Sequence, residues 1–438
     1  MNDRTTALVA RLADSLFEGI QQDADLVRGW RGSFDIELLK LLRAVALVVL
    51  SRWFAAENQR LCAEAKARGF VVERHPKIRF LTLFGHVSTN SSYFRRTSDG
   101  QGFRPLNAHY EVQGSRSTIA VQRALTDFGM ERSFADASKA FAEHYGVEVG
   151  TTTVQNITER HARRIRDEFE QWCQAAPEPP RSRRADVMVL AMDGCALRVT
   201  ERVPAGCIGR KDLPRNQPVR VDRWVDVRLA KARRDGDATG VFVCKYDTFD
   251  TVLDSLEGAA KRCGMTDETQ LLFLGDGGNG LMEAAMRRFP TARFILDRCH
   301  LRHHLFGVVE HIGTHPDAVR QLVDIFDAAI GSGQAWRVIN ELRVLVPADV
   351  PGKPIESCPI TNLINYLHRF EDAVQYDEFE ANGWPTGSGE IESGHRQVPQ
   401  ARLKIPGAAW TPANLNAMAA TRAARESGLW DQFWPKAA

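Results

Sequence analysis

Three short acidic motifs framed by glycine are the part of this sequence that could do chemistry. They are Met192-Asp193-Gly194, Leu274-Gly275-Asp276-Gly277-Gly278 and Gly387-Ser388-Gly389-Glu390-Ile391-Glu392-Ser393. The first two aspartates each end an apolar run that predicts a strand, and the third motif opens a segment that predicts a helix. A carboxylate at the carboxyl end of a buried strand points into the crevice where α/β sheets place their sites. Carboxylates that meet there predict a magnesium site.

Phosphoryl transfer by two metal ions needs several hard oxygen ligands, and two strand-end aspartates with one helix glutamate could supply them. The neighbouring glycines would let a phosphate backbone approach without interference from a Cβ atom. A single Asp-Gly pair more often caps a turn, but three framed acids in one plausible sheet order favour the metal site. Glu390 competes with Glu392, because a helix turns about 200° in two residues and only one of them can face the metals.

The elements that must position these acids form a mixed pattern of strands and helices. Strands are predicted at residues 187–192, 219–229, 241–246, 271–274 and 293–296, and helices at 251–263 and 281–289. From residue 300 to about 379 the pattern is largely helical. Three strands followed by alternating helices and strands predict an α/β fold, with a mixed sheet and helices on its faces.

The amino-terminal part reads as mainly helical. We predict a long helix over 36–68 ended by Gly69, and a β-hairpin over 79–96 that turns at Thr89-Asn90-Ser91. Helices over 133–145 and 151–166 resemble a helix-turn-helix, although an ordinary helical hairpin has the same spacing. In a helix-turn-helix, the outward, base-reaching residues would be Thr153, Gln155, Asn156 and Arg160. A Pro-rich linker at 177–185 marks the clearest domain boundary.

Charge and cysteine content narrow the class of protein. The formal net charge is only +2, yet residues 181–234 hold 14 Lys/Arg against 6 Asp/Glu, and residues 393–425 hold 5 basic residues and no acid. Basic blocks beside a metal-type site suggest a polyanionic partner. The eight cysteines include no Cys-x-x-Cys pair, which argues against a zinc ribbon or a disulfide framework. The longest apolar run, residues 44–50, is far too short for a membrane span, so we expect an intracellular, soluble protein.

A fourth motif, Ile295-Leu296-Asp297-Arg298-Cys299-His300-Leu301, lies between the second and the third. In this order, the motifs resemble those of bacterial insertion-sequence transposases of the DDE class, Mutator-like elements included. The resemblance covers residues 186–425, and the hairpin and helix-turn-helix ahead of it are similar to the DNA-binding region of the same family. It implies a ribonuclease H-like core interrupted by an α-helical insertion before the glutamate. It also implies a homo-oligomer acting on double-stranded DNA in the bacterial cytoplasm, associated with the nucleoid.

Carried over residue by residue, the resemblance implies that Asp193 and Asp276 are the catalytic aspartates. Glu392 would be the glutamate, because related enzymes place a small residue directly after it and Ser393 fits. These three would bind two Mg²⁺ or Mn²⁺ ions. Asp297 and His300 match an Asp-x-x-His signature that implies a site role for His300, whereas its own sequence context favours a structural histidine.

A basic tail follows the glutamate. Arg396, Arg402 and Lys404 resemble family residues that contact phosphates, and Trp410 would either stack on a base or pack in the core. Relatives often carry a cysteine pair in the region matching 94–105, and this chain has none there, so no zinc is expected.

The sequence therefore predicts a DNA transposase that cleaves and transfers strands. The predicted parts are 1–70 (helical), 71–115 (hairpin), 116–176 (helix-turn-helix), 177–185 (linker), 186–300 (core), 301–385 (α-helical insertion) and 386–438 (glutamate helix and basic tail). The alternatives are a transposase-derived DNA-binding protein without catalysis, and a sugar hydrolase with paired acids. The hydrolase explains neither the basic flanks nor the helix-turn-helix.

Overall fold

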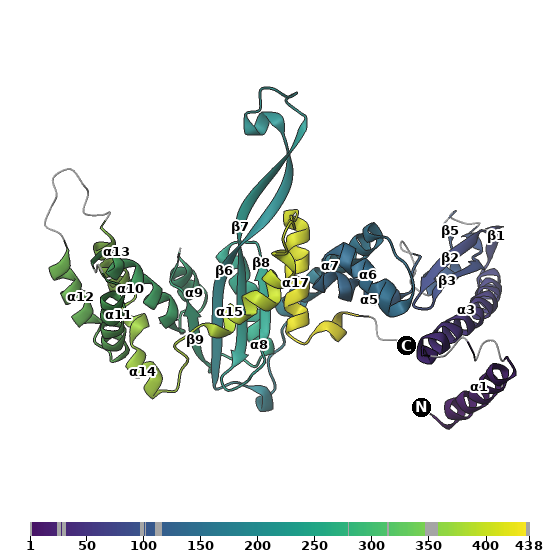
Figure 1. The fold of residues 1–438 in the computed structure, drawn as a ribbon, viewed down its shortest axis with the longest axis horizontal. Coiled ribbons are helices and arrows are strands. Elements are labelled where there is room, and N and C mark those ends of the chain that lie inside the picture. The colour runs from purple at the N-terminus through teal and green to yellow at the C-terminus, as the bar shows by residue number, and fades with distance from the viewer. Residues whose placement is uncertain are drawn as a thin grey trace. The chain divides into compact units, whose positions relative to one another are not determined.

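The computed structural model describes residues 2–23, 28, 32–96, 100, 102–109, 116–278, 280–312, 315–346 and 358–434 (Figure 1). The chain divides into two compact units. The first comprises Met1–Phe128 with Ala135–Val154, and the second comprises Gly129–Phe134 with Gln155–Ala438. The predicted linker at 177–185 therefore lies inside the second unit, where Ala185 donates its backbone N–H to Gly264 O at 2.9 Å.

The first unit combines long helices with short antiparallel strands. Its elements are α1 (Asp3–Gln22), α3 (Phe34–Ala67), β1 (Phe70–Arg74), β2 (Lys77–Thr82), β3 (Gly85–Asn90), β4 (Tyr93–Arg96), β5 (Gly102–Phe103) and α4 (Pro105–His109). Helix α3 confirms the long helix predicted from the sequence. Phe54 of α3 stacks on Phe80 of β2 with ring centroids 5.3 Å apart, and this pair anchors the helix on the strands.

The predicted position of the hairpin turn is wrong. Strands β2 and β3 form the hairpin and turn at residues 83–84, whereas β4 pairs with β1 in a different sheet. Gly85 has a φ of 129°, which favours glycine, and the Thr82 hydroxyl donates to its carbonyl at 2.8 Å. The turn chemistry at Thr89-Asn90-Ser91 instead lies where β3 ends and the chain crosses to the other sheet.

Three helices connect these strands to the rest of the chain. They are α5 (Ile119–Glu131), α6 (Phe134–Tyr145) and α7 (Thr151–Gln174). Helices α6 and α7 confirm the two helices predicted around residues 146–150, although α7 continues well beyond residue 166. Gly146 ends α6 with a φ of 63°, a conformation that glycine adopts without strain.

Among the described residues of the second unit, five strands form one mixed sheet in the order β10-β9-β6-β7-β8. The strands are β6 (Val187–Pro204), β7 (Pro218–Arg234), β8 (Val241–Lys245), β9 (Gln270–Gly275) and β10 (Arg293–Leu296). Strands β10, β9 and β6 are parallel, while β7 is antiparallel to β6 and β8. The predicted α/β class with a mixed sheet is confirmed.

Strand β6 differs from the prediction in length. The parallel pairing with β9 ends at Ala191, but antiparallel pairing with β7 continues to Pro204. Asp193 therefore lies inside a strand, and the prediction that it ends one is wrong. The strand continues because Leu197 and Val199 are fully buried and β7 supplies a partner at every position.

Helices flank the sheet and fill the sequence after it. They include α8 (Phe249–Arg262), α9 (Leu281–Arg288), α10 (Arg298–Ile312), α11 (Pro316–Gly331), α12 (Ala335–Leu345), α13 (Pro359–Arg369) and α14 (Tyr376–Ala381). The helical region predicted from residue 300 is confirmed. The chain then returns to the sheet through α15 (Gly389–His395), a π-helical turn (Arg396–Gln400), α16 (Ala401–Leu403) and α17 (Pro412–Glu426). No helix in the described residues is both long enough and apolar enough to cross a bilayer.

A buried histidine on α7 gives the second unit a pH-dependent stability. His161 lies against the Trp434 ring, with centroids 4.8 Å apart, and is only 6% exposed. Burial, together with the charges of Arg164 and Arg160, lowers its pKa from 6.5 to about 3. The folded protein therefore keeps this ring neutral at pH values where the unfolded chain protonates it.

We predict that stability falls as the pH drops below 6.5, because the unfolded state then binds a proton that the folded state does not. Between neutral pH and about pH 4.5 this one histidine should cost about 2 to 3 kcal/mol. Urea unfolding at both pH values measures the loss, and His161→Phe should remove that share of it. An equal pH dependence in the variant would contradict the assignment.

Candidate functional site

Three aspartates lie at the same edge of the sheet. Asp276 directly follows β9 and Asp297 directly follows β10, while Asp193 lies two residues beyond Ala191, where the pairing of β6 with β9 ends. Because these three strands are parallel, their carboxyl ends meet at one edge. The sequence prediction that Asp276 ends a strand is confirmed, and the edge also gathers Asp297.

Asp193 and Asp276 line one small cavity of about 160 Å³. Its other lining residues include Gly194, Asp226 and Arg228. A Cβ atom at position 194 would fall too close to the Asp226 carboxylate on the neighbouring strand, so any larger residue here would displace that side chain. The two predicted aspartates therefore share a cavity, although they come from different strands.

Local hydrogen bonds hold the turn that carries Asp276. Its Oδ1 accepts the Gly278 N–H at 2.9 Å, and its backbone carbonyl accepts the Tyr366 hydroxyl at 2.9 Å. Tyr366 belongs to α13, in the helical segment between β10 and α15. That helical segment therefore fixes the backbone at one of the two aspartates.

A second group of ligand-type side chains consists of Asp297, His300 and Glu392. One donor atom from each of these residues lies within 4.8 Å of the other two. Asp297 is fully buried and accepts hydrogen bonds from Ser388 Oγ at 2.7 Å and Cys299 N at 3.0 Å. His300 Nδ1 lies 2.7 Å from Asp297 Oδ2.

These contacts shift the pKa values of His300 and Asp297. The hydrogen bond to Asp297 raises the pKa of His300 to about 8, against the opposing effect of burial. The charges of Asp193 and Asp276 raise it further, so both cavity aspartates act on the same imidazole as Asp297. Burial alone raises the pKa of Asp297, but the hydrogen bonds from His300 and Ser388 outweigh it and keep that pKa below its ordinary value. The cavity and the second group therefore form one electrostatic site.

Helix α15 directs its two glutamates differently. Glu390 Oε2 accepts hydrogen bonds from Lys231 Nζ at 2.9 Å and Arg233 Nε at 2.8 Å, both from β7. These hydrogen bonds lower the pKa of Glu390, against the raising effect of burial. Glu392 instead belongs to the group with Asp297 and His300. Of the two glutamates, Glu392 therefore lies with other acids of the site, whereas Glu390 is held by two basic residues of β7.

His395, one turn after Glu392 on α15, lies against Asp193 of β6. Its Nε2 lies 3.2 Å from Asp193 Oδ2, at ion-pair distance, although the atoms are not aligned for a hydrogen bond. The ring is almost fully buried. Sequence analysis missed His395 and Ser388. The three-residue spacing from Glu392 to His395 was the available signal, because residues three apart share a helix face.

The predicted DNA-contacting residues fall into two groups. Thr153 and Asn156 of α7 are exposed, as are Arg396 and Lys404. Gln155 and Arg160 are only partly exposed, which leaves them less accessible than Thr153 and Asn156. Gln155 Nε2 donates to Glu159 Oε1 at 2.9 Å, which turns it along its own helix, and burial lowers the pKa of Arg160.

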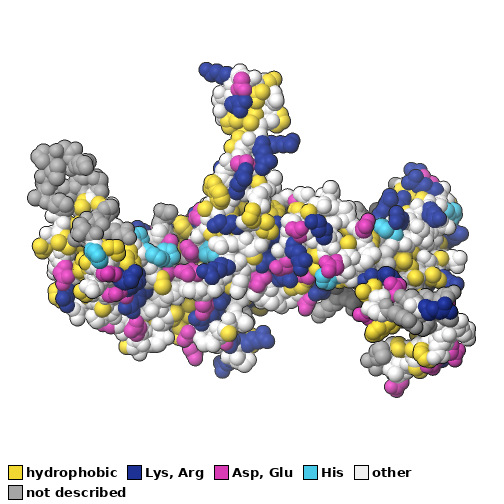
Figure 2. Space-filling model, viewed as in Figure 1, with side chains coloured by type: hydrophobic (Ala, Val, Ile, Leu, Met, Phe, Trp, Pro, Cys, Tyr) yellow, Lys and Arg dark blue, Asp and Glu magenta, His cyan; other side chains and the backbone are white. Residues whose placement is uncertain are grey.

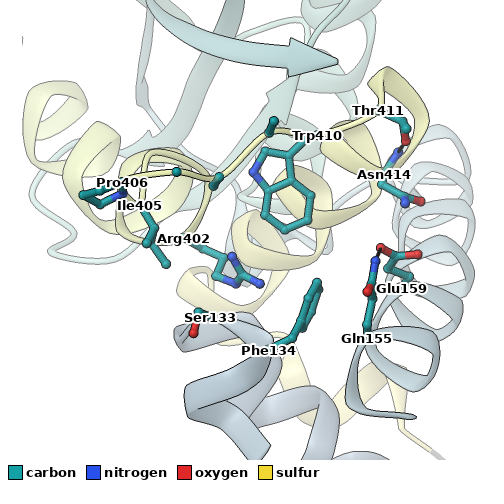
Figure 3. Close-up of a pocket in the computed structure, with 13 residues that line it drawn as sticks. Ser133, Phe134, Gln155, Glu159, Arg402, Ile405, Pro406, Trp410, Thr411 and Asn414 are labelled. Carbon is teal, nitrogen blue, oxygen red and sulfur yellow. Dashed lines mark hydrogen bonds between the residues drawn. The ribbon is translucent and has the colours of Figure 1, made fainter. Parts of the chain in front are cut away.

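Arg402 is a structural residue, and its predicted exposure to phosphate is wrong. The guanidinium is 3% exposed and lies between the rings of Phe134 and Trp410, at 4.6 and 4.7 Å (Figure 3). Its Nε donates to Gly129 O at 2.7 Å, and burial lowers its pKa to about 10. Trp410 is also buried, so the alternative that it packs in the core is confirmed.

We predict that Arg402→Ala destabilises the protein by about 3 kcal/mol, because it removes two cation–π contacts and leaves the Gly129 carbonyl without its donor. Urea unfolding measures this loss. Lys404→Ala, at an exposed neighbour, should change stability by less than about 0.5 kcal/mol. A stable Arg402→Ala protein with weakened DNA binding would show that the residue contacts DNA instead.

Comparison with known proteins adds no identification. No protein-family model matches the chain, and no curated protein matches its sequence. The chemistry of the site therefore follows from its residues: Asp193, Asp276, Asp297 and Glu392 supply acidic oxygens, and His300 supplies a charged imidazole.

Proposed function

We propose that this protein is a DNA transposase that cleaves and joins DNA strands by metal-dependent phosphoryl transfer. One observation carries the proposal: carboxylates from β6, from the ends of β9 and β10, and from α15 gather at one edge of the sheet. Acids far apart in the sequence have no folding reason to converge, because their mutual repulsion costs stability. A site that binds cations and acts on phosphates accounts for the cost.

The donor set fits divalent metal ions. Asp193, Asp276 and Glu392 offer the hard oxygen ligands that Mg²⁺ or Mn²⁺ prefers. With Asp226 and Asp297, the acids of the site outnumber the nearby Arg228 and His300. We assign these three carboxylates as the residues that hold the ions. When bound, two such ions would activate the attacking oxygen and stabilise the leaving oxygen of an in-line displacement.

The surrounding side chains orient the ligands and the DNA. Asp297 holds His300 through Nδ1, which fixes the ring beside Glu392. With a pKa of about 8, His300 carries a proton near neutral pH and can donate it in a hydrogen bond to a phosphate oxygen. Buried Ser388 ties the start of α15 to Asp297 and so sets the position of Glu392. The absent Cβ of Gly194 leaves room beside Asp226 in the cavity.

The reaction proceeds in two displacements without a protein-linked intermediate. Water attacks a phosphorus atom of the DNA, the bond to the 3′-oxygen breaks, and a 3′-hydroxyl is freed. This hydroxyl then attacks a phosphorus atom of target DNA, and the 3′-oxygen of the target strand leaves. The role of the chain is to hold both reacting oxygens in line.

The fold supports a ribonuclease H-like core. A mixed sheet with parallel and antiparallel halves, followed by an all-α segment between β10 and α15, is the arrangement that the resemblance implies. Exposed Thr153 and Asn156 on α7 support DNA contact by the amino-terminal region. Exposed apolar residues along α3, including Leu39, Leu42, Val45 and Val49, support assembly into a homo-oligomer.

Strand cleavage tests the proposal. Purified protein is incubated with a duplex that carries the DNA flanking its coding region, in Mg²⁺ or in EDTA. We expect metal-dependent nicks that leave 3′-hydroxyl ends, detected by extension with a polymerase. Salt-sensitive DNA binding without cleavage in Mg²⁺ or Mn²⁺ would favour a non-catalytic, transposase-derived DNA-binding protein. Absence of both would overturn the proposal.

A further inference from the structure

Strands β6 and β7 extend beyond the sheet as a two-stranded ribbon. Between residues 196 and 226, β6 and β7 pair with each other and with no other strand of the sheet in the described part of the chain. An isolated bridge also joins Val199 to Trp410. We call residues 198–224 the β6–β7 arm; it projects from the sheet in Figure 1. An isolated two-stranded ribbon is at best marginally stable in water, so a projection of this length needs a role outside the core.

The arm carries an excess of positive charge. It contains seven Lys/Arg and three Asp/Glu. Each acid is already engaged: Asp222 holds Arg198 and Arg220, Glu201 holds Arg223 at 3.0 Å, and Asp212 holds Arg210 at 2.6 Å.

Exposed Arg202, Lys211 and Arg215 have no acidic partner among the described residues. Figure 2 shows Lys and Arg side chains over the projecting ribbon. The arm is therefore a cationic surface whose own acids do not neutralise it.

One face of the arm concentrates this charge. Arg202 and Arg220 are directly opposite each other in the register, and so are Arg198 and Trp224, four residues away on the same face, with Thr200 and Asp222 between the two pairs. Like charges directly opposite each other destabilise a strand pair. Trp224 is 67% exposed, an unusual position for a large aromatic side chain on a ribbon. A bound polyanion would relieve the repulsion, and the indole could contact it as well.

The same face leads to the carboxylates. Continuing toward the sheet, it passes the pairs Ala196 with Asp226 and Gly194 with Arg228. Gly194, Asp226 and Arg228 line the cavity that contains Asp193 and Asp276. A polyanion that lies along this face of the arm therefore ends at that cavity, which Asp193 enters from the opposite face of β6.

We propose that the β6–β7 arm binds duplex DNA and guides it to the acidic site, an inference that rests on the proposed action on DNA. A two-stranded ribbon fits the major groove, which is about 12 Å wide, and unpaired cations along it neutralise phosphates. Duplex DNA is favoured over a second copy of the chain, because two arms with the same excess charge repel each other.

The test compares two triple variants with the same charge change. The arm variant is R202Q/K211Q/R215Q, and the control is R320Q/R337Q/R343Q, whose residues are exposed on α11 and α12. Binding of a fluorescein-labelled duplex of random sequence is followed by anisotropy between about 50 and 200 mM salt. Far-UV circular dichroism and thermal melting check folding, and sedimentation gives the oligomeric state.

We expect the arm variant to bind at least about tenfold more weakly, with the slope of log affinity against log salt reduced by about 3. The control should change both values much less, and R202K/R215K should bind like wild type. Equal weakening in both triple variants, or a changed oligomeric state that explains the loss, would overturn the arm proposal. Unaltered binding in the arm variant would overturn the arm proposal and leave the proposed function standing. A wild-type protein that binds no DNA would overturn both the arm proposal and the proposed function.

Discussion

Replacing Asp193 or Asp276 by asparagine should lower the rate of metal-dependent strand cleavage by about 10³-fold or more. Asparagine keeps the shape of the side chain but removes the charge that a divalent ion needs, and an ion contributes several kcal/mol of transition-state stabilisation. Both aspartates line the same cavity, so the two single variants should fail alike. DNA affinity should hardly change, because neither substitution removes a cation. Rates at saturating DNA and Mg²⁺ measure the effect.

Asp226→Asn is the matched control for this prediction. Asp226 lines the same cavity, but it lies on β7, is half exposed and pairs with Arg228 at 3.5 Å. Its loss should reduce the rate less than about tenfold, since it gives up only an exposed ion pair. If Asp193→Asn or Asp276→Asn cleaved DNA at the wild-type rate in Mg²⁺, that aspartate would not be a metal ligand.

The second large effect separates the two glutamates of α15. Glu392→Gln should lower the cleavage rate by about the same factor as the aspartate variants. It should leave stability nearly unchanged, because Glu392 is exposed beside Asp297 and His300. Glu390→Gln should do the reverse. It weakens the hydrogen bonds to Lys231 and Arg233, whose side chains are only 10% exposed, and should cost about 1 to 3 kcal/mol after allowance for the half-exposed carboxylate.

Urea unfolding and cleavage per folded molecule measure the two outcomes side by side. Glu390→Gln should retain a rate within about tenfold of wild type, as expected for a residue that supports the helix without touching the reacting atoms. A cleaving Glu392→Gln protein together with an inactive but stable Glu390→Gln protein would exchange the two assignments.

Local sequence signals predicted much of the fold. The apolar run of residues 293–296 is strand β10, and the Ala- and Leu-rich segment ended by Gly69 is helix α3. These elements follow from nearby residues alone. The continuation of β6 past Asp193 could not be predicted in this way, because it depends on pairing with β7 through Pro218.

The site too combines features that nearby residues determine with features that distant residues determine. The acids themselves were visible in the sequence, but the face of α15 is set by Lys231 and Arg233, more than 150 residues earlier in the chain. The predicted role of Arg402 was wrong because its burial depends on residues distant in the sequence. Its position in a basic segment suggested phosphate contact, while Phe134 and Trp410, brought together only by folding, enclose its guanidinium. Burial by distant partners is the information that local patterns lack.

A calorimetric titration with Mn²⁺ in the presence of duplex DNA is the most direct test of the account. It measures whether Asp193, Asp276 and Glu392 bind divalent metal ions together. Wild-type protein should bind two ions, and the combined variant D193N/D276N/E392Q should bind neither while it remains folded and still binds DNA. Mn²⁺ binding by the combined variant that equals that of wild type would contradict the account.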